Sequence, residues 1–210
     1  GLVNDILDMA KIESGKMEIH AERTSLAELI ENIVVVITPL VKEKNQDFQI
    51  CIREVRHEHL MLDSVRMNQV LMNLISNAIK FTPEGGSIRV TVEESLSPHP
   101  GQAHFTFTVS DTGMGMSREF QNNIFTAFVR ERDSRVDHIE GSGLGMAITG
   151  MIVANMGGSI RVESEPGMGS IFTVDLDFCR AEPEMDSESE GIAISSVKCL
   201  LVEADPEICE

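Results

Sequence analysis

Hydrophobic residues recur along the chain at two spacings, and the spacing predicts where helices and strands lie. Where apolar residues return every three or four positions, we expect helices over 1–15, 26–44, 64–81, 117–124 and 143–156. Apolar and polar residues alternate, or short apolar runs occur, over 17–23, 48–53, 60–62, 87–94, 104–109, 159–164, 171–178 and 197–202, which predicts strands there. Helices and strands mixed in this way favour an α+β fold with a sheet packed on helices.

Polar signals mark the ends of two of these helices. Ser25 and Glu28 form a Ser-x-x-Glu capping box, and Asp63 or Ser64 can cap the helix that follows. Pro39 lies inside the 26–44 helix, where it has no N–H to donate and crowds the preceding turn. We therefore expect that helix to be kinked or divided.

The net charge of the chain narrows the classes of partner that it can bind. The chain has 210 residues, with 17 Lys and Arg against 34 Asp and Glu, a net charge of −17. Such a surface repels a phosphate backbone and anionic lipid, so we expect no nucleic-acid partner and no membrane contact by this chain. The four cysteines lack metal-ligand spacing and predict reduced thiols in a cytoplasmic protein. No apolar run reaches the ~20 residues of a membrane span.

Composition also divides the chain. Five acids crowd the segment after residue 181, which predicts a solvated linker: Glu182, Glu184, Asp186, Glu188 and Glu190. The first residues already follow a helical pattern, so the chain looks like part of a longer protein. The apolar stripe of 1–15 fits packing against partner helices or against its own domain, and both remain open.

Three polar motifs stand next to these elements. Glycines alternate through 141–145 directly before an apolar helix, an arrangement that can present backbone N–H groups to an anion, although such loops are often simple turns. Asp111 closes a strand and is followed by Gly-x-Gly. Asn73 and Asn77 lie four residues apart on one face of the 64–81 helix, although asparagine forms helices poorly. The polar, aperiodic stretch 129–140 predicts a mobile lid.

Taken in order, these motifs resemble the N, G1, F and G2 boxes of sensor histidine kinases. The matching segments are Asn73–Thr82, Asp111–Gly115, Phe125–Phe128 and Gly141–Gly145. The resemblance implies a two-layer α/β sandwich of the gyrase and histidine-kinase ATPase type, a mixed sheet packed on helices, with a short N-terminal helix. It implies the end of a dimerisation and phosphoacceptor helix (1–19), an ATP-binding catalytic domain (20–178), an acidic linker (179–196) and a truncated receiver-like start (197–210) of a hybrid kinase.

The resemblance also assigns roles to residues. It makes Asp111 the acceptor for the adenine amino group and Asn77 a ligand of Mg²⁺, with Asn73 one turn nearer the metal. Lys80 and Arg130 would neutralise phosphate charge. Asn73, Lys80 and Arg130 are therefore the expected catalytic residues. The remaining ATP contacts are Phe81, Gly113, Gly115, Phe128, Gly141, Ser142, Gly143, Leu144, Gly145 and Ser170.

Three differences from related proteins bear on the expected activity of this chain. Related gyrase-type ATPases carry a glutamate base where this chain has Asn73, an amide without useful basicity, which disfavours water attack and favours kinase activity. None of the six histidines has the family's phosphoacceptor context. Ala204 stands where receivers carry a second acid, which puts metal binding by that part in doubt.

We therefore expect a protein-histidine kinase that uses ATP and Mg²⁺ and is inactive alone, because the acceptor histidine is missing. Its expected partners are a phosphoacceptor histidine domain of the same or a sister chain, a receiver domain, and a second copy in a full-length homodimer. The expected location is the cytoplasm, and the full-length protein could carry a membrane anchor. Two alternatives are a nucleotide-dependent module without catalysis and a gyrase-type ATPase.

Overall fold

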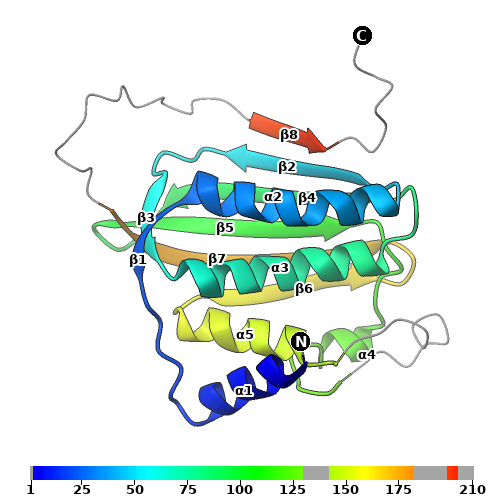
Figure 1. Cartoon of the computed structure of the whole chain (residues 1–210), viewed down its shortest axis with the longest axis horizontal. Helices are drawn as coiled ribbons and strands as arrows, with labels where there is room; N and C mark the ends of the chain where they lie inside the picture. The colour runs from blue at the N-terminus through cyan, green and yellow to red at the C-terminus, as the bar shows by residue number, and fades with distance from the viewer. Residues whose placement is uncertain (1, 130–141, 182–197, 203–210) are drawn as a thin grey trace.

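Residues 2–129, 142–181 and 198–202 are described by the computed structural model of this chain. Figure 1 shows the elements in chain order. The helices are α1 (Leu2–Glu13), α2 (Leu26–Glu43), α3 (Ser64–Phe81), α4 (Arg118–Gln121) and α5 (Gly145–Asn155). The strands are β1 (Glu22–Ser25), β2 (Asp47–Arg53), β3 (His59–Leu62), β4 (Ser87–Leu96), β5 (Gln102–Asp111), β6 (Ser159–Glu165), β7 (Gly169–Arg180) and β8 (Lys198–Val202).

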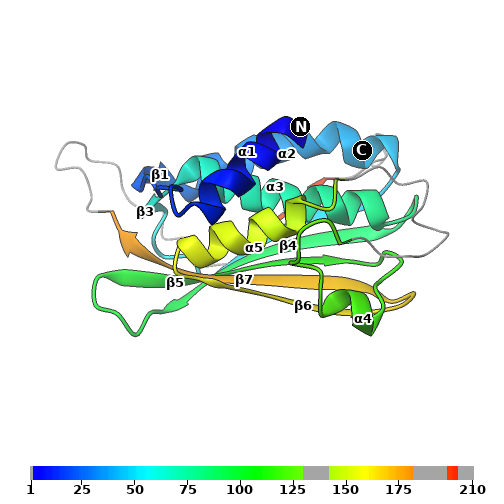
Figure 2. The ribbon, with the colours of Figure 1, turned by 90° about the horizontal axis from the view of Figure 1, so that it is seen from below.

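The strands form one sheet in the order β1-β3-β7-β5-β4-β2-β8, and β6 also pairs with β7. The β2–β4 pair is parallel, with Phe48 opposite Ile88, and the other pairs are antiparallel. Figure 2 shows α1, α2, α3 and α5 on one side of this sheet, so the molecule has two layers. The predicted fold, a mixed sheet packed on helices with a short N-terminal helix, is confirmed.

The core lies between the sheet and the helices, and the alternation in the sequence explains it. In β5, Phe105, Phe107 and Val109 are fully buried, while the residues between them are half-buried on the other face. Ile33 and Ile37 of α2 belong to the same buried core, on its helical side. Burying each such side chain contributes about 1.5–3 kcal/mol, so the sheet and helices stabilise each other.

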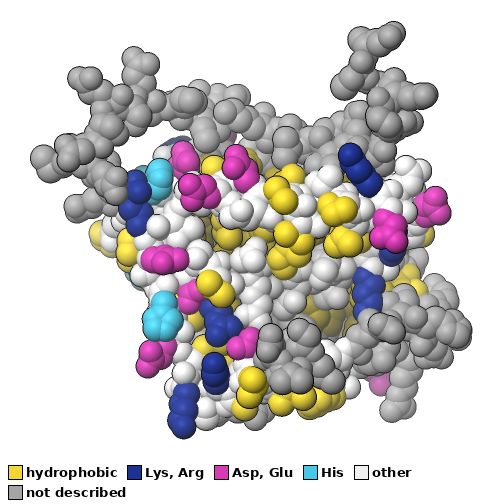
Figure 3. All heavy atoms as spheres, viewed as in Figure 1, with side chains coloured by type: hydrophobic (Ala, Val, Ile, Leu, Met, Phe, Trp, Pro, Cys, Tyr) yellow, Lys and Arg dark blue, Asp and Glu magenta, His cyan; other side chains and the backbone are white. Residues whose placement is uncertain are grey.

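The outer side of α2 keeps a strip of apolar side chains in solvent. Val35, Val36 and Leu40 are exposed, and Figure 3 shows hydrophobic side chains gathered over this helix. Of the two outcomes predicted at Pro39, a division of the helix is wrong, because α2 is one continuous helix, while a kink stays a prediction. Pro39 is exposed, so the carbonyl that loses its partner lies on the outer side, where water can bond it.

Another expectation differs from the structure. The strand expected over 17–23 forms only at Glu22–Ser25, where it pairs with β3, because the preceding residues have no neighbouring strand in the described sheet. Near the end of β4, the buried Glu94 carboxylate lies 2.6 Å from Nδ1 of His57.

The expected strand 197–202 is present as β8. It pairs antiparallel with β2, with Cys199 opposite Cys51, and so extends the edge of the same sheet. The resemblance to a receiver did not predict that position.

Candidate nucleotide-binding site

The fold brings three of the sequence motifs together. Most of the expected site residues lie on α3, on the loop after β5 and at the start of α5, in the right-hand half of Figure 1, while Phe128 follows α4 and Ser170 lies in β7. The ideal Cβ position of Gly145 is 3.8 Å from the Asn73 side chain, and that of Gly113 is 2.7 Å from the Phe81 carbonyl oxygen. α3 therefore contacts both glycine motifs.

Asn73 joins α3 to the first turn of α5. Its Nδ2 atom donates to the Gly145 carbonyl (3.3 Å) and to Thr149 Oγ1 (3.1 Å), and Thr149 Oγ1 donates to the same carbonyl (2.8 Å). Thr149 is completely buried. This hydrogen-bonded group fixes the distance between the two helices. The sequence analysis missed Thr149, although a Thr one turn after Gly145 could have indicated a back-bond to that carbonyl.

Asn77 lies one turn further along the same face. Its Nδ2 atom is 3.2 Å from Met146 Sδ, which leaves Oδ1 as the amide atom to face a cation. Lys80 follows, with Nζ 5.1 Å from the Phe81 ring centre, a cation–π distance. Lys80, which was predicted to neutralise phosphate charge, therefore lies beside Phe81, which was predicted to contact ATP.

A second lysine was missed. Lys44 Nζ donates to the carbonyls of Ile79 (2.8 Å) and Lys80 (3.0 Å) at the end of α3. An ammonium there satisfies terminal carbonyls and complements the helix dipole, so it fixes the end of α3 near the site. Its position in a different helix, far earlier in the chain, gave no sequence signal.

Asp111 is a half-buried carboxylate at the end of β5. Its Oδ1 accepts from the Gly113 N–H (2.8 Å). Burial raises the pKa of Asp111 above its usual value, while backbone hydrogen bonds from Gly113 and Ser170 oppose that shift. A carboxylate that has lost water in this way favours a further donor, such as an amino group on a ligand.

The glycines beside Asp111 have a packing role as well. A Cβ at Gly115 would collide with the Glu165 carbonyl oxygen, and one at Gly169 would collide with the Asp111 carbonyl oxygen. Both residues also have positive φ, +64° and +92°. These glycines let the loop after β5 lie against the β6–β7 turn, whatever they contribute to a ligand.

The loop after β5 separates two hollows. Lys80, Phe81 and Gly113 line one of 690 Å³, and Asp111 and Ser170 line another of 510 Å³, with Thr112 in the wall of both. Both fall in the size range of small-ligand pockets.

The N-terminus of α5 is suited to an anion. Leu144, the N-cap residue, makes no side-chain cap, and the first turn contains no acid. The loop before it is held by Leu144 N–H donating to Ser142 Oγ (3.3 Å) and by Phe128 N–H donating to the Gly143 carbonyl (3.0 Å). The first N–H groups and the positive helix end can therefore stabilise a phosphate.

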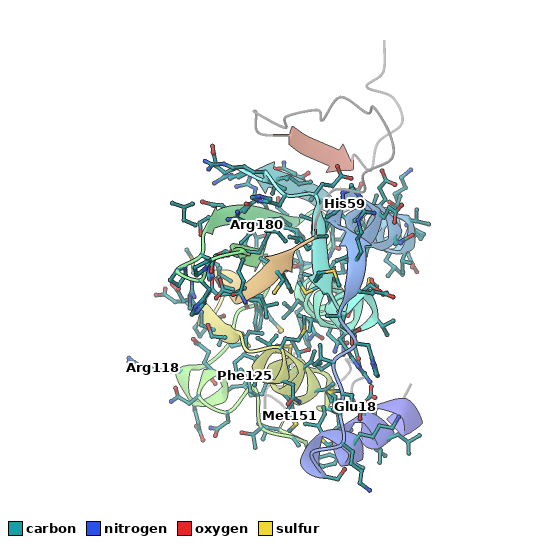
Figure 4. All side chains as sticks on the ribbon, turned by 90° about the vertical axis from the view of Figure 1, so that its left-hand side faces the viewer. Glu18, His59, Arg118, Phe125, Met151 and Arg180 are labelled. Carbon is teal, nitrogen blue, oxygen red and sulfur yellow. The ribbon has the colours of Figure 1, made fainter. Side chains whose placement is uncertain are left out.

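The two phenylalanines of the F box differ in position. The Phe125 ring packs against α5, 3.3 Å from the ideal Cβ position of Gly150, and Figure 4 shows Phe125 beside that helix. Phe128 is 70% exposed and has a φ of +63°, rare for a bulky residue. Phe125 therefore holds the segment after α4 against α5. The Phe128 ring lies in solvent, where it is available for other contacts.

Some expected residues lie outside the part of the chain that the structure describes. These are Arg130, Gly141, all of the expected lid after Val129, and the Glu203–Asp205 segment. Within the described ranges, no helix is long and apolar enough to cross a membrane, and no three His, Cys, Asp or Glu side chains cluster as a metal site.

Comparisons with known proteins agree with this geometry. Residues 62–180 match the family model described as histidine kinase-, DNA gyrase B- and HSP90-like ATPases. The chain is 38% identical over 182 residues to the virulence sensor protein BvgS of Bordetella bronchiseptica, covering 86% of this chain and 14% of that protein. It is 32% identical over 203 residues to the sensor protein GacS of Pseudomonas syringae, covering 96% of this chain and 22% of that protein. The chain therefore spans less than a quarter of these relatives.

A solved structure matches as well. Full-length ShkA, in complex with AMPPNP, superposes with a TM-score of 0.70 at 30% identity, over 87% of this chain and 36% of that one. The nucleotide analogue is a ligand of that protein.

Proposed function

Because the chain belongs to the histidine kinase-, DNA gyrase B- and HSP90-like ATPases, we propose that it is the catalytic part of a hybrid sensor histidine kinase. It binds Mg-ATP and transfers the γ-phosphoryl group to a histidine on a phosphoacceptor domain. The observation that carries this proposal is the contact of Asn73 with Gly145 and Thr149, because it holds the uncapped start of α5 against the polar face of α3.

Different residues hold different parts of ATP. Asp111 accepts a hydrogen bond from the adenine amino group, and Ser170 and the glycine loop lie beside it. The first N–H groups of α5, with Ser142 and Gly143 ahead of them, hold the phosphates. Lys80 reduces their negative charge, and we assign the same role to Arg130 on the strength of its sequence position. Phosphoryl transfer needs mainly this positioning and charge stabilisation.

Mg²⁺ would bind through Asn77 Oδ1 and the phosphates. A hard cation accepts neutral oxygen ligands, so an amide suits it. When bound, the cation would neutralise charge that develops on the phosphate oxygens. We assign Asn73 to the same metal site, since its Nδ2 atom is bonded to α5 and its Oδ1 atom is therefore the amide atom that can face the cation.

Asn73 also favours a kinase over a hydrolase. An amide cannot accept a proton from water, so no base stands at this point of α3. The phosphoryl group is then kept for an imidazole supplied by another domain. We propose the partners from the motif resemblance: a phosphoacceptor histidine domain, a receiver domain and a second copy in the full-length homodimer, acting in the cytoplasm.

One experiment tests the function. The 210-residue chain is incubated with γ-labelled ATP and a separately supplied phosphoacceptor domain from a relative. We expect label on the acceptor histidine and none on the chain itself. Asn77→Ala should abolish transfer, whereas Asn68→Ala, an exposed asparagine on the same helix, should leave it unchanged. Tight ATP binding without any transfer would instead favour the module without catalysis, and steady phosphate release without an acceptor would favour an ATPase.

A further inference from the structure

Three polar side chains join α1 to the first turns of α3. Arg66 Nη1 lies 3.2 Å from Asp8 Oδ2, and Gln69 Nε2 donates to the same oxygen at 2.9 Å. Arg66 Nη1 also donates to Gln69 Oε1 at 2.7 Å. Each side chain therefore bonds both of the others, and we call this closed triangle the α1–α3 latch.

The latch is more than a surface ion pair. The side chains of Asp8 and Arg66 are only 18% and 19% exposed. Exposed pairs contribute little because water screens them and both side chains lose freedom. Here one carboxylate oxygen receives a guanidinium and an amide, and hydrogen bonds to an ionised acceptor are roughly twice as strong as neutral ones.

The apolar contacts of α1 do not by themselves fix its direction. Met9 and Ile12 are partly buried against the core, while Ile6 and Leu7 are half exposed. Methionine packs adaptably, so such a contact tolerates sliding and rotation. The three hydrogen bonds of the latch form together only in one relative orientation of α1 and α3. They therefore specify the direction of α1, which the apolar contacts leave open.

The same face of α3 continues from the latch to the candidate nucleotide site. Gln69, Asn73 and Asn77 are spaced four residues apart and so lie in one row. The first contacts α1, the second contacts Gly145 of α5, and the third contacts Met146. The single helix α3 therefore carries both the residues that contact α1 and the residues assigned to the phosphates and the metal.

We propose that Asp8, Arg66 and Gln69 are positioning residues that fix the direction of α1 relative to α3, and so set where the phosphoacceptor helices joined to α1 present their histidine to bound ATP. The positioning role rests on the proposed function. The first residues of α1 lie at the same end of the molecule as the start of α5 (Figures 1 and 2), which directs a continuing helix past the phosphate end of the site. None of the three residues is expected to touch ATP.

The first test uses the 210-residue chain and does not depend on catalysis. Hydrogen exchange is measured at the amides of 2–13, together with the Kd for ATP by calorimetry. In Asp8→Ala we expect α1 amides to exchange at least tenfold faster while the Kd changes less than twofold. Lys11→Ala, an exposed change on the same helix, should alter neither. The charge swap Asp8→Arg with Arg66→Asp should restore slow exchange. Unchanged exchange in Asp8→Ala would overturn the latch.

The second test adds phosphoryl transfer, in the chain joined at its N-terminus to the phosphoacceptor helices of a relative. Asp8→Ala should lower kcat at least fivefold with the KM for ATP unchanged, and the charge swap should recover most of it. A parallel loss of kcat, ATP affinity and melting temperature would mean a merely structural contact and overturn the positioning role. If the parent fusion transfers nothing, the proposed function fails, while the exchange data still decide whether the latch exists.

Discussion

At the scale of single residues, the charge of Asp111 lowers the stability of the fold but strengthens a bond to a ligand. Its carboxylate is already partly buried before any ligand arrives, so burial raises its pKa above 3.8 and the charged form is disfavoured in the folded protein. The same lost hydration strengthens a bond to a ligand amino group. A residue selected for stability alone would not be charged here.

Asp111→Asn should stabilise the empty protein at neutral pH. Between pH 3.8 and the raised pKa, the folded protein holds a proton that the unfolded chain has released, so the free energy of unfolding falls as pH rises through that window. Asparagine does not titrate and can still accept from Gly113. Thermal melts should show a higher melting temperature for the variant at pH 7 and a difference that vanishes towards pH 4. Asp47→Asn, an exposed change, should show no such trend.

The same variant should bind ATP roughly tenfold more weakly, because a hydrogen bond to a charged acceptor contributes about 1–1.5 kcal/mol more than one to a neutral acceptor. Calorimetry with Mg-ATP and Mg-GTP measures this. The parent should prefer ATP, since a carboxylate cannot pair with the guanine carbonyl. Equal affinities in the parent would contradict the role assigned to Asp111.

Two glycines with similar backbone angles should differ in their tolerance of a methyl group. Gly115 and Gly85 have φ of +64° and +74°, but only Gly115 faces the Glu165 carbonyl, while Gly85 faces open space. Gly85→Ala should cost about 1 kcal/mol for the left-handed backbone. Gly115→Ala should cost about 3 kcal/mol or more, because overpacking is added. Urea denaturation measures both, and equal losses would show that the loop can move aside.

These residues show how far sequence reasoning reaches into the site. Asp111 and Asn77 were predictable, because a carboxylate at a strand end and two asparagines on one helix face are visible in sequence. Thr149 and Lys44 were not, since their partners are backbone carbonyls brought near only by folding. For Gly115, the sequence indicated room for a ligand, while the structure adds a neighbouring backbone that no local pattern encodes.

At the scale of elements, caps were predicted best and the interior of α2 worst. Ser25 accepts from Glu28 N–H and Asp63 from Arg66 N–H, as the cap signals indicate. Such bonds are local, so sequence alone determines them. Pro39 is different, because tertiary packing of Ile33, Ile37 and Val41 outweighs its local cost and keeps α2 continuous.

Pro39→Ala should therefore stabilise the protein by about 2 kcal/mol. Alanine restores a helical N–H and removes the clash with the preceding turn, which together cost about 3 kcal/mol, and part of this is offset by a freer unfolded chain. Chemical denaturation checks the value. Val36→Ala, at an exposed position of the same helix, should stay within about 0.5 kcal/mol. A destabilised Pro39→Ala would mean that the proline supports a contact on the outer face.

At the scale of the whole molecule, the charge of −17 acts on every part of the fold at once. Excess acids repel one another more in the compact state than in the expanded chain, so self-repulsion lowers stability. The fold class was predictable at this scale, because alternation fixes strand faces and helical spacing fixes helix faces. The strand order was not, since it depends on pairings between distant segments.

Screening should raise stability. An increase from about 0.02 M to about 0.2 M salt shortens the screening length to below 10 Å, and a gain of about 1 kcal/mol would raise the melting temperature by roughly 2–4 °C. Sodium chloride and choline chloride should act alike. An effect confined to one cation would instead indicate a specific ion site, and no effect would mean that the acids are already compensated.

The place of β7 in the sheet has a consequence for biosynthesis. β7 lies between β3 and β5, with Leu60 opposite Arg180, although it follows all but β8 in chain order. A nascent chain that has reached only β6 holds β1 and β3 apart from β5, β4 and β2, with unpaired edges on both groups. Such edges invite pairing with other chains. The emergence of residues 169–180 from the ribosome therefore closes the sheet, and until then the edges of β3 and β5 stay open to pairing with other chains.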